Sequence, residues 1–494
     1  MTNRYRIRYV LYPVLILSVI TIFSFVVSCT REIAPVTYRN YPHDVGQILV
    51  NRCATEGCHD YRSKDACAGL DLSSWDAMFQ GSRNNSCVIP YRPDQSFLLY
   101  SVNTFDDLGP KLLPTMPLNK PHLSRDEVIL LRDWILNGAP SSSGYVKWSE
   151  NPLRKKIYLA NQGCDLLTVF DAQTKLAMRC INLGITGATE APHDMYVSPD
   201  GQYLYVSYYA NTIFQKYRTT DDVKVGELNL IDPSWHSLSI SGNSQIGLAS
   251  HLAGDGKVAL IDLNTMNLIV KYEGSGMFIY PHGNAMNYDG TLAYITSQQS
   301  NYIYKVDLTD PFNPDVQTIP LQTGDIPNAN GIYKPYDVEF SPDYSKYYVT
   351  CQGTNELRIF QASNDSLLQV IPTSGVPQVM AFSNERPYVF VPCMEDTANL
   401  VAQSSVNVIN LNTNQLITTI YTGHQPRSVV VDDASDCVWV ANRNIYGVGW
   451  VPHHTTICAG RNGYLTIIDQ NTLQLKPNWK CEVSVDPYHI TIRE

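Results

Sequence analysis

The chain has 494 residues, of which 44% are apolar and 17% are charged. This composition supports a sizeable core and excludes general disorder. A formal net charge of −10 argues against a general nucleic-acid binder, because phosphate binding needs a basic surface. The many tyrosines, glycines and prolines (32, 29 and 29) favour short strands and turns over long helices.

The first 28 residues have the form of an export signal, with three arginines before the apolar run 9–27. The run is long enough to span a bilayer, so a permanent anchor helix is the alternative. Its end, Val-Val-Ser-Cys at 26–29, resembles the lipobox of bacterial lipoproteins. The resemblance implies a lipid on Cys29, a tether over 29–41 and an extracytoplasmic protein anchored to a bacterial membrane, on the periplasmic side or the cell surface.

A cysteine pair followed by a histidine comes next. Four residues separate Cys53 from Cys58, and His59 follows directly. The motif resembles the haem-attachment motif of c-type cytochromes, in which two residues normally separate the cysteines. A wider loop still lets both thiols reach the haem vinyl groups if the loop bulges. A zinc site is the competing interpretation, although two further ligands at compact spacing are not evident.

The surroundings of this motif favour haem. A helical apolar pattern over 44–52 precedes it, and Met116 follows in a proline-rich loop that suits a second axial ligand. A capping box at 124–127 then opens a last helix. Met116 as a core residue and Met78 as the ligand are the alternatives.

This order of elements resembles small class I cytochromes c over 42–140. The resemblance implies one covalent haem c, with the iron between a histidine and a methionine. It assigns the haem to Cys53, Cys58, His59 and Met116. Of the other cysteines, Cys67 could pair with Cys87, and Cys164 could pair with Cys180.

A repeat fills the chain from 154 to the end, after a linker predicted over 141–153. Its copies begin at Pro192, Trp235, Pro281, Pro335, Pro377, Pro426 and Pro487. Short β-rich runs follow each copy but the last, and four strands at this period make a propeller blade. The repeats resemble the YVTN-type β-propeller family. They imply a mainly β fold with seven blades over 154–494, in which the C-terminal strand completes the first blade.

The topology places the eight histidines of this region on one face of the propeller. Three of them, His193, His236 and His282, open the innermost strands of consecutive blades, and His251 is the expected fourth member. Imidazole suits copper, iron and zinc, so a metal or a haem-like cofactor is one interpretation. Rings that only brace the turns between blades are the other. The same face is expected to carry His424, His453, His454, His489, Cys351, Cys393 and Cys458.

A haem domain joined to a propeller resembles the architecture of periplasmic nitrite reductases, and a histidine-bearing seven-bladed propeller resembles nitrous oxide reductase. Both likenesses are architectural. The linker counts against close coupling, because it delivers the chain to the face opposite the histidines.

Three functions follow. The first is a membrane-anchored c-type cytochrome that transfers electrons to a redox partner protein, with the propeller as a docking module. The second is an oxidoreductase with a second metal or haem-like cofactor on the histidine face. The third is an extracytoplasmic binding scaffold. Nucleic acid is not an expected partner of any of them.

Overall fold

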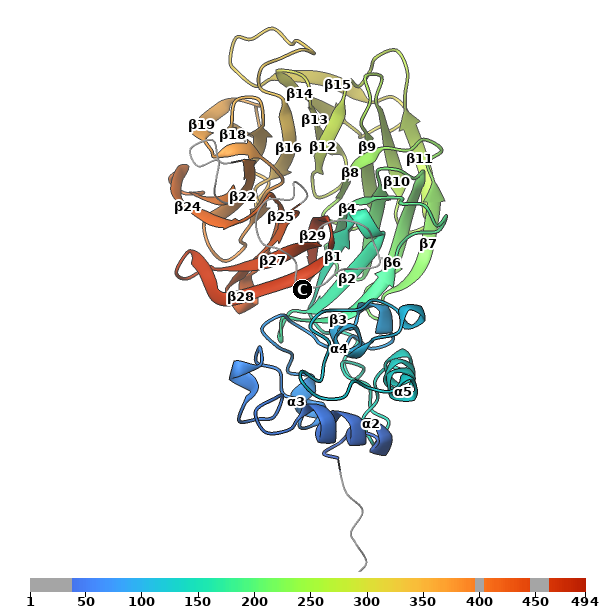
Figure 1. Cartoon of the computed structure of the whole chain (residues 1–494). Helices are drawn as coiled ribbons and strands as arrows, with labels where there is room; N and C mark the ends of the chain where they lie inside the picture. The colour runs from blue at the N-terminus through green and yellow to red at the C-terminus, as the bar shows by residue number, and fades with distance from the viewer. Residues whose placement is uncertain (1–37, 396–403, 445–461) are drawn as a thin grey trace, which may run out of the picture.

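The computed structural model describes residues 38–395, 404–444 and 462–494. A small N-terminal domain with short α-helices lies against a seven-bladed β-propeller (Figure 1), so the predicted propeller is confirmed. Among the described residues, none of the helices has the length and apolar character needed to cross a membrane. The predicted export signal (1–28) and residues 29–37 of the predicted tether, Cys29 included, lie outside the described ranges, as do His453, His454 and Cys458.

The N-terminal domain is built from short helices around one buried cluster. Its α-helices are α2 (His43–Ile48), α3 (Trp75–Met78), α4 (Phe97–Val102) and α5 (Arg125–Leu136). A π-helical turn, Leu49–Cys53, continues α2, and short 3-10 turns cover Lys64–Ala66, Pro93–Gln95 and Asp106–Leu108. Trp75 and Leu131 are almost fully buried in the cluster that these elements share.

The predicted capping box fixes the start of α5. The Glu127 backbone N–H donates to the Ser124 hydroxyl (3.3 Å), and the Ser124 N–H donates to the Glu127 carboxylate (2.7 Å). Such a cap is worth about 1 kcal/mol. The same carboxylate accepts from Arg52 Nη1 at 2.5 Å. Since Arg52 directly precedes Cys53, this ion pair ties the cysteine motif to the last helix of the domain.

The blades are four-stranded antiparallel sheets, with a fifth short strand in the sixth. Given from the innermost strand outward, the first three are β29 (Pro487–Arg493), β1 (Lys156–Asn161), β2 (Leu166–Asp171) and β3 (Leu176–Asn182); β4 (Pro192–Val197), β5 (Tyr203–Tyr208), β6 (Ile213–Arg218) and β7 (Val223–Asn229); and β8 (Trp235–Ile240), β9 (Ile246–His251), β10 (Lys257–Asp262) and β11 (Asn267–Tyr272).

The other four blades have the same order. They are β12 (Pro281–Met286), β13 (Leu292–Ser297), β14 (Tyr302–Asp307) and β15 (Asp315–Pro320); β16 (Pro335–Phe340), β17 (Lys346–Cys351), β18 (Glu356–Gln361) and β19 (Leu367–Pro372); β20 (Gly375–Pro377) with β21 (Ala381–Phe382), β22 (Tyr388–Glu395), β23 (Ser404–Asn410) and β24 (Gln415–Gly423); and β25 (Pro426–Asp432), β26 (Cys437–Asn442), β27 (Asn462–Asp469) and β28 (Gln474–Val485).

The two ends of the propeller meet in the first blade. The C-terminal strand β29 pairs with β1, so that Ile492 lies opposite Ile157 and Ile490 opposite Leu159. Alternate side chains of these strands are buried between the first and seventh blades. The ring is therefore closed by backbone hydrogen bonds between segments more than 300 residues apart, which leaves no free sheet edge at the junction.

The N-terminal domain docks on β3, the outermost strand of the first blade. Asn85 donates from Nδ2 to the Lys175 carbonyl (2.8 Å) and accepts from the Ala177 N–H (2.7 Å). Arg92 Nη1 donates to the Cys180 carbonyl at 2.8 Å. Side chains of the domain thus cover the exposed backbone edge of this strand.

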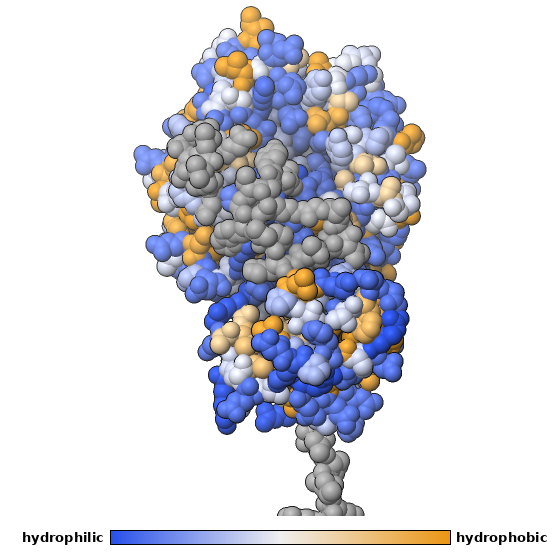
Figure 2. All heavy atoms as spheres, viewed as in Figure 1, coloured by the Kyte–Doolittle hydropathy of each residue, from blue (hydrophilic) through white to orange (hydrophobic). Residues whose placement is uncertain are grey.

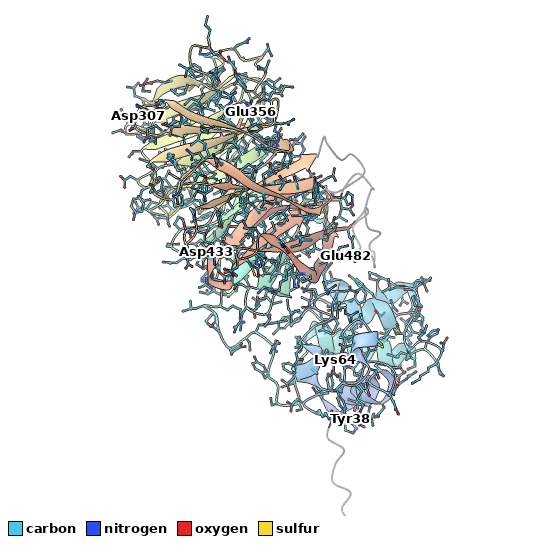
Figure 3. All side chains as sticks on the ribbon, turned by 90° about the vertical axis from the view of Figure 1, so that its left-hand side faces the viewer. Tyr38, Lys64, Asp307, Glu356, Asp433 and Glu482 are labelled. Carbon is cyan, nitrogen blue, oxygen red and sulfur yellow. The ribbon has the colours of Figure 1, made fainter. Side chains whose placement is uncertain are left out.

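Figure 3 shows the domain at the edge of the propeller, beside blade seven with its labelled Asp433 and Glu482, and away from Asp307 and Glu356. Residues 141–148 follow the domain surface, where Trp148 packs on Phe79, whereas the Pro152 carbonyl accepts from Arg493 Nη1 in β29 (2.6 Å). The Ser142 N–H donates to the Asn40 carbonyl (2.7 Å). The face seen in Figure 2 is mainly hydrophilic with scattered apolar side chains, as is ordinary for a water-exposed surface.

Candidate metal centre in the propeller channel

One position of the repeat lines the channel. It is the second residue of each innermost strand, or the residue that follows β20 in the sixth blade. The seven residues are His193, His236, His282, Tyr336, Gln378, Arg427 and Tyr488. In most of these strands the residue is skipped in the pairing; Pro192 pairs with Tyr208 and Asp194 with Ser207, for example. Such a bulge re-aims a side chain, here away from the blade and toward the channel.

Contacts between ring systems link six of the seven residues into a closed belt, which we call the channel ring. The ring centroids lie 4.2 Å apart for Tyr488 and His193, and 4.5 Å for His193 and His236. The belt continues from His236 to His282 at 5.6 Å, and from there to Tyr336 at 4.2 Å. The guanidinium of Arg427 lies over the Tyr336 and Tyr488 rings, which closes the belt.

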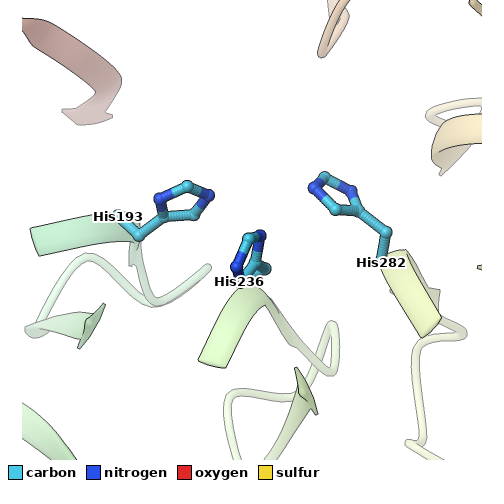
Figure 4. Close-up of side chains that lie close together, drawn as sticks. All are labelled: His193, His236 and His282. Carbon is cyan, nitrogen blue, oxygen red and sulfur yellow. The ribbon is translucent and has the colours of Figure 1, made fainter. Parts of the chain in front are cut away.

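The three histidines converge within this ring. His193, His236 and His282 each offer one ring nitrogen, and these nitrogens all lie within 4.8 Å of one another. Figure 4 shows the three imidazoles turned toward a common point between blades two, three and four. Nitrogens bound to one ion at about 2.1 Å are at most about 4.2 Å apart, so small rotations bring all three onto one metal. We call this group the histidine triad.

Hydrogen bonds orient two of the rings. His282 Nδ1 lies 2.9 Å from the Tyr336 carbonyl, which can only accept, so this nitrogen carries the proton and Nε2 keeps its lone pair. His193 Nδ1 lies 2.7 Å from the side-chain amide nitrogen of Gln162, while its Nε2 is buried without a hydrogen-bond partner. For Nε2 to offer a lone pair to a metal, Nδ1 must carry the proton, which requires the Gln162 amide to turn its oxygen toward the ring. A buried ring nitrogen left unpaired is what a metal ion would satisfy.

Burial keeps the triad neutral. It is the main cause that lowers the pKa of His236 to about 4 and the pKa of His193 and His282 well below the ordinary histidine value. The positive charge of Arg427 lowers the pKa of all three further. Neutral imidazole is the form that binds metals, so this site needs little deprotonation before it takes an ion.

Two other histidines expected near the triad do not join it. His251, the predicted fourth member, packs against Trp235 with ring centroids 5.5 Å apart, so that expectation was wrong. His489 accepts from the Met195 N–H through Nδ1 (3.3 Å) and faces Asp194 through Nε2 (3.2 Å). Both nitrogens of His489 are therefore used in the protein.

The predicted haem residues lie on two segments that the fold holds together. Lys120 Nζ, close after Met116, donates to Thr55 Oγ1 inside the cysteine motif (2.9 Å). Met116 packs against the buried cluster that contains Cys53. Both motif cysteines are free thiols, and Nδ1 of His59 is buried without a partner.

These donors fit a covalent haem, since two available thiols adjoin an imidazole and a thioether comes from the neighbouring loop. A zinc site fits less well. Among the residues that the structure describes, the histidine triad is the one group of three or more potential ligands found this close together, and Cys53, Cys58 and His59 form no such group.

Both predicted cysteine pairs were wrong. Cys67 and Cys87 are free thiols, and their sulfurs face the Gly57 and Met78 carbonyls instead. Cys180 is also free, whereas Cys164 belongs to a disulfide. Short separation along the chain did not identify the bonded partner.

Comparison with solved structures finds proteins with a similar fold. A structure of a functionally unknown protein from Desulfotomaculum acetoxidans DSM 771 aligns with a TM-score of 0.50 and 13% identity, over 67% of this chain and 99% of that one. Hydrazine synthase from Kuenenia stuttgartiensis aligns with a TM-score of 0.48 and 16% identity, over 62% and 92%. The likeness is one of fold alone. No protein-family model and no curated protein matches the chain.

Sequence reasoning missed the other members of the channel ring. Tyr336, Arg427 and Tyr488 occupy the same repeat position as the triad, so the repeat alignment contained the signal. It also missed the acidic layer beneath them. In β16, Asp337 is buried and Glu339 is half-buried, and desolvation is the main cause that raises the pKa of both carboxyl groups.

Proposed function

We propose that the protein is an extracytoplasmic oxidoreductase with a metal centre on the histidine triad and a c-type haem in the N-terminal domain. The observation that carries the proposal is the convergence of three neutral imidazoles from consecutive blades, with their ring nitrogens within 4.8 Å. Three protein ligands leave a metal with an open position, which is typical of catalytic sites rather than structural ones. Imidazole ligands suit copper, iron or zinc.

The haem would be held by Cys53, Cys58, His59 and Met116, and when bound it supplies one-electron redox chemistry. The protein's own contribution is to fix these donors. The ion pair of Arg52 with Glu127 and the bond from Lys120 to Thr55 hold the motif against the methionine loop. The haem domain is also fixed to the first blade through Asn85, which supports a single working unit with the propeller.

The lipobox resemblance completes this proposal. Lipid on Cys29 would anchor the protein to a bacterial membrane outside the cytosol. A c-type cytochrome and a disulfide at Cys164 are both compatible with that oxidising compartment. A redox partner protein would then supply or remove electrons at the haem domain.

The test is metal analysis of protein made in a host that matures cytochromes c. Total metal is measured by mass spectrometry, and the haem iron, measured from its absorbance, is subtracted. We expect about one further ion per chain in the wild type and its loss in His236→Ala. His251→Ala is the matched control, because it removes a nearby histidine outside the triad and should keep the ion.

Haem content in each variant shows whether the chain has folded and matured. Equal non-haem metal in the wild type and His236→Ala would end the oxidoreductase proposal. Haem without a triad metal would leave an electron-transfer cytochrome with a docking propeller. A colourless protein from the same host would refute the haem.

A further inference from the structure

The channel ring contains a buried arginine with unused hydrogen-bond donors. Arg427 has 3% relative exposure, and its Nε and Nη1 atoms are buried without hydrogen-bond partners within the described part of the chain. A buried guanidinium with unpaired donors is costly, and native structures rarely keep one without a reason. The unused donors therefore point to a ligand that accepts from them.

Two tyrosines place this arginine next to the histidine triad. The Tyr488 ring lies 4.4 Å from the guanidinium carbon of Arg427 and 4.2 Å from the His193 ring. On the other side, the Tyr336 ring lies 5.0 Å from the same carbon and 4.2 Å from the His282 ring. One tyrosine, tilted against a triad histidine, thus separates Arg427 from the triad on each side of the channel.

The charges in the ring require a negative partner. Three neutral imidazoles leave the charge of a bound metal ion uncompensated, and Arg427 adds another positive charge. The carboxylates below offset only part of this charge. The charge of Asp194 stabilises protonated Arg427, but Asp194 also accepts from the Leu238 N–H (2.9 Å) and faces His489, while Asp337 accepts from the Met380 N–H (3.2 Å). An anion bound between the metal and the arginine would offset part of both charges.

We propose that the channel ring binds a small planar oxyanion, such as a carboxylate, between the triad metal and Arg427, and that this class of anion is the substrate. The proposal rests on the metal centre proposed above. The unused Nε and Nη1 donors lie on two edges of a rigid, planar guanidinium, so each can donate to an oxyanion in a fixed direction, which a lysine ammonium does not provide.

The experiment uses the full-length haem protein loaded with copper(II) and titrated with formate. The copper EPR signal is read at a field separate from that of low-spin ferric haem, and His236→Ala identifies the signal of the triad. We expect formate to change the copper spectrum of the wild type. In Arg427→Gln the apparent Kd for formate should rise roughly tenfold to a hundredfold, because a charged hydrogen-bonding partner is lost.

Two further variants make the result specific. Arg427→Lys keeps the charge and loses the fixed planar arrangement of donors, so its Kd should lie between those of the wild type and Arg427→Gln. Arg358→Gln is the matched control. Arg358 is a buried arginine of blade five whose guanidinium is fully engaged with Glu356 and the Leu321 carbonyl, and its loss should leave formate binding unchanged.

The outcomes separate the two proposals. Copper bound at the triad with the same formate affinity in the wild type and Arg427→Gln would overturn the anion site and leave the metal centre. If the wild type takes up no copper at the triad, the metal centre fails. In that case, formate binding to the metal-free protein is measured by saturation-transfer NMR. Binding that is weakened in Arg427→Gln would support an anion site without a metal. Binding that does not depend on Arg427, or no binding at all, would overturn this inference too.

Discussion

His282 Nδ1 lies 2.9 Å from the backbone carbonyl oxygen of Tyr336, the channel-ring residue of the next blade. One member of the ring therefore sets the tautomer of its neighbour, because the carbonyl requires a proton on Nδ1. The lone pair of His282 Nε2 is therefore available to a ligand in the channel. The propeller repeat thus supplies both the ligands of the triad and part of the shell that orients them.

The neutral triad predicts metal binding that depends little on pH. Burial lowers the pKa of His236 to about 4, so protons do not compete with a metal ion until the pH approaches that value. We expect the apparent zinc affinity to change less than about threefold between about pH 5.5 and 7.5, measured by competition with a chelator. A steep loss of affinity below about pH 6.5 would mean that the rings have ordinary pKa values.

A second prediction concerns Asp337. Burial raises the pKa of its carboxyl group to about 7, and the nearby negative charge of Asp194 adds to the rise. Between its ordinary pKa of 3.8 and this value the folded state holds a proton that the unfolded state has lost. Stability from this group is therefore lost as the pH rises through that window. We expect Asp337→Asn to raise the free energy of unfolding at pH 8 by about 2 kcal/mol, and to do less at pH 5.

Asp343 in the same blade is the matched control for that measurement. Its carboxylate accepts from the Ser341 and Ser345 hydroxyls, and these bonds lower its pKa. Asp343→Asn should therefore destabilise the protein at pH 8. Urea unfolding of both variants at the two pH values gives the comparison, and parallel shifts in the two variants would contradict the assignment.

The propeller could be predicted because each blade is specified by a short sequence pattern, and this pattern recurs along the chain. Each blade needs alternating apolar strands and a turn, so the pattern recurs, and an incomplete first blade requires the last strand to close it. The triad could be predicted for the same reason, since one repeat position carries histidine in three consecutive blades. What the repeat could not show was the bulge at that position, which turns these side chains into the channel.

The bulge also explains why His251 was misassigned. It lies opposite Trp235 in the pairing of β8 with β9, next to the strand that carries His236. Neighbouring Cα positions suggested a shared site, but the bulge turns His236 into the channel while His251 stays packed on Trp235. The docking of the N-terminal domain was likewise beyond sequence reasoning, because it depends on bonds from Asn85 and Arg92 to the backbone of β3.

The proposed anchor predicts a change in processing. Replacement of Cys29, which lies outside the described residues, removes the only thiol of the lipobox. Cys29→Ala should accumulate as unprocessed precursor or be released from the membrane, as shown by fractionation and the mass of the mature chain. Fully processed, membrane-bound protein from this variant would rule out the lipid anchor.

The proposed haem ligation predicts a spectral change in Met116→Leu. If the proposal holds, the Met116 side chain would supply the second ligand of the iron and raise the potential, while Cys53 and Cys58 would hold the haem covalently. The variant should therefore keep its haem but lose the methionine–iron charge-transfer band and show a lower midpoint potential. Met78→Leu is the control, because Met78 is buried in the domain core and should leave the spectrum unchanged. The opposite pattern would make Met78 the ligand.

The last prediction tests the docking of the two domains. Asn85 makes two bonds to the β3 edge, and its backbone has a φ of 79°, which glycine adopts without strain. Asn85→Gly therefore removes the docking side chain and keeps the backbone. Loss of these bonds should weaken docking by about 1–3 kcal/mol. Hydrogen exchange at the β3 amides should become faster.

Asn119→Gly is the control for that variant, because Asn119 also has a positive φ, of 56°, in an exposed loop of the same domain away from β3. Its exchange at β3 should match the wild type. If Asn85→Gly also matched the wild type, the apolar contacts of Leu176 and Met178 with the domain core, rather than the bonds of Asn85, would hold the interface. Because those contacts bury side chains on both sides, a Met178→Ala variant would then show the faster exchange instead.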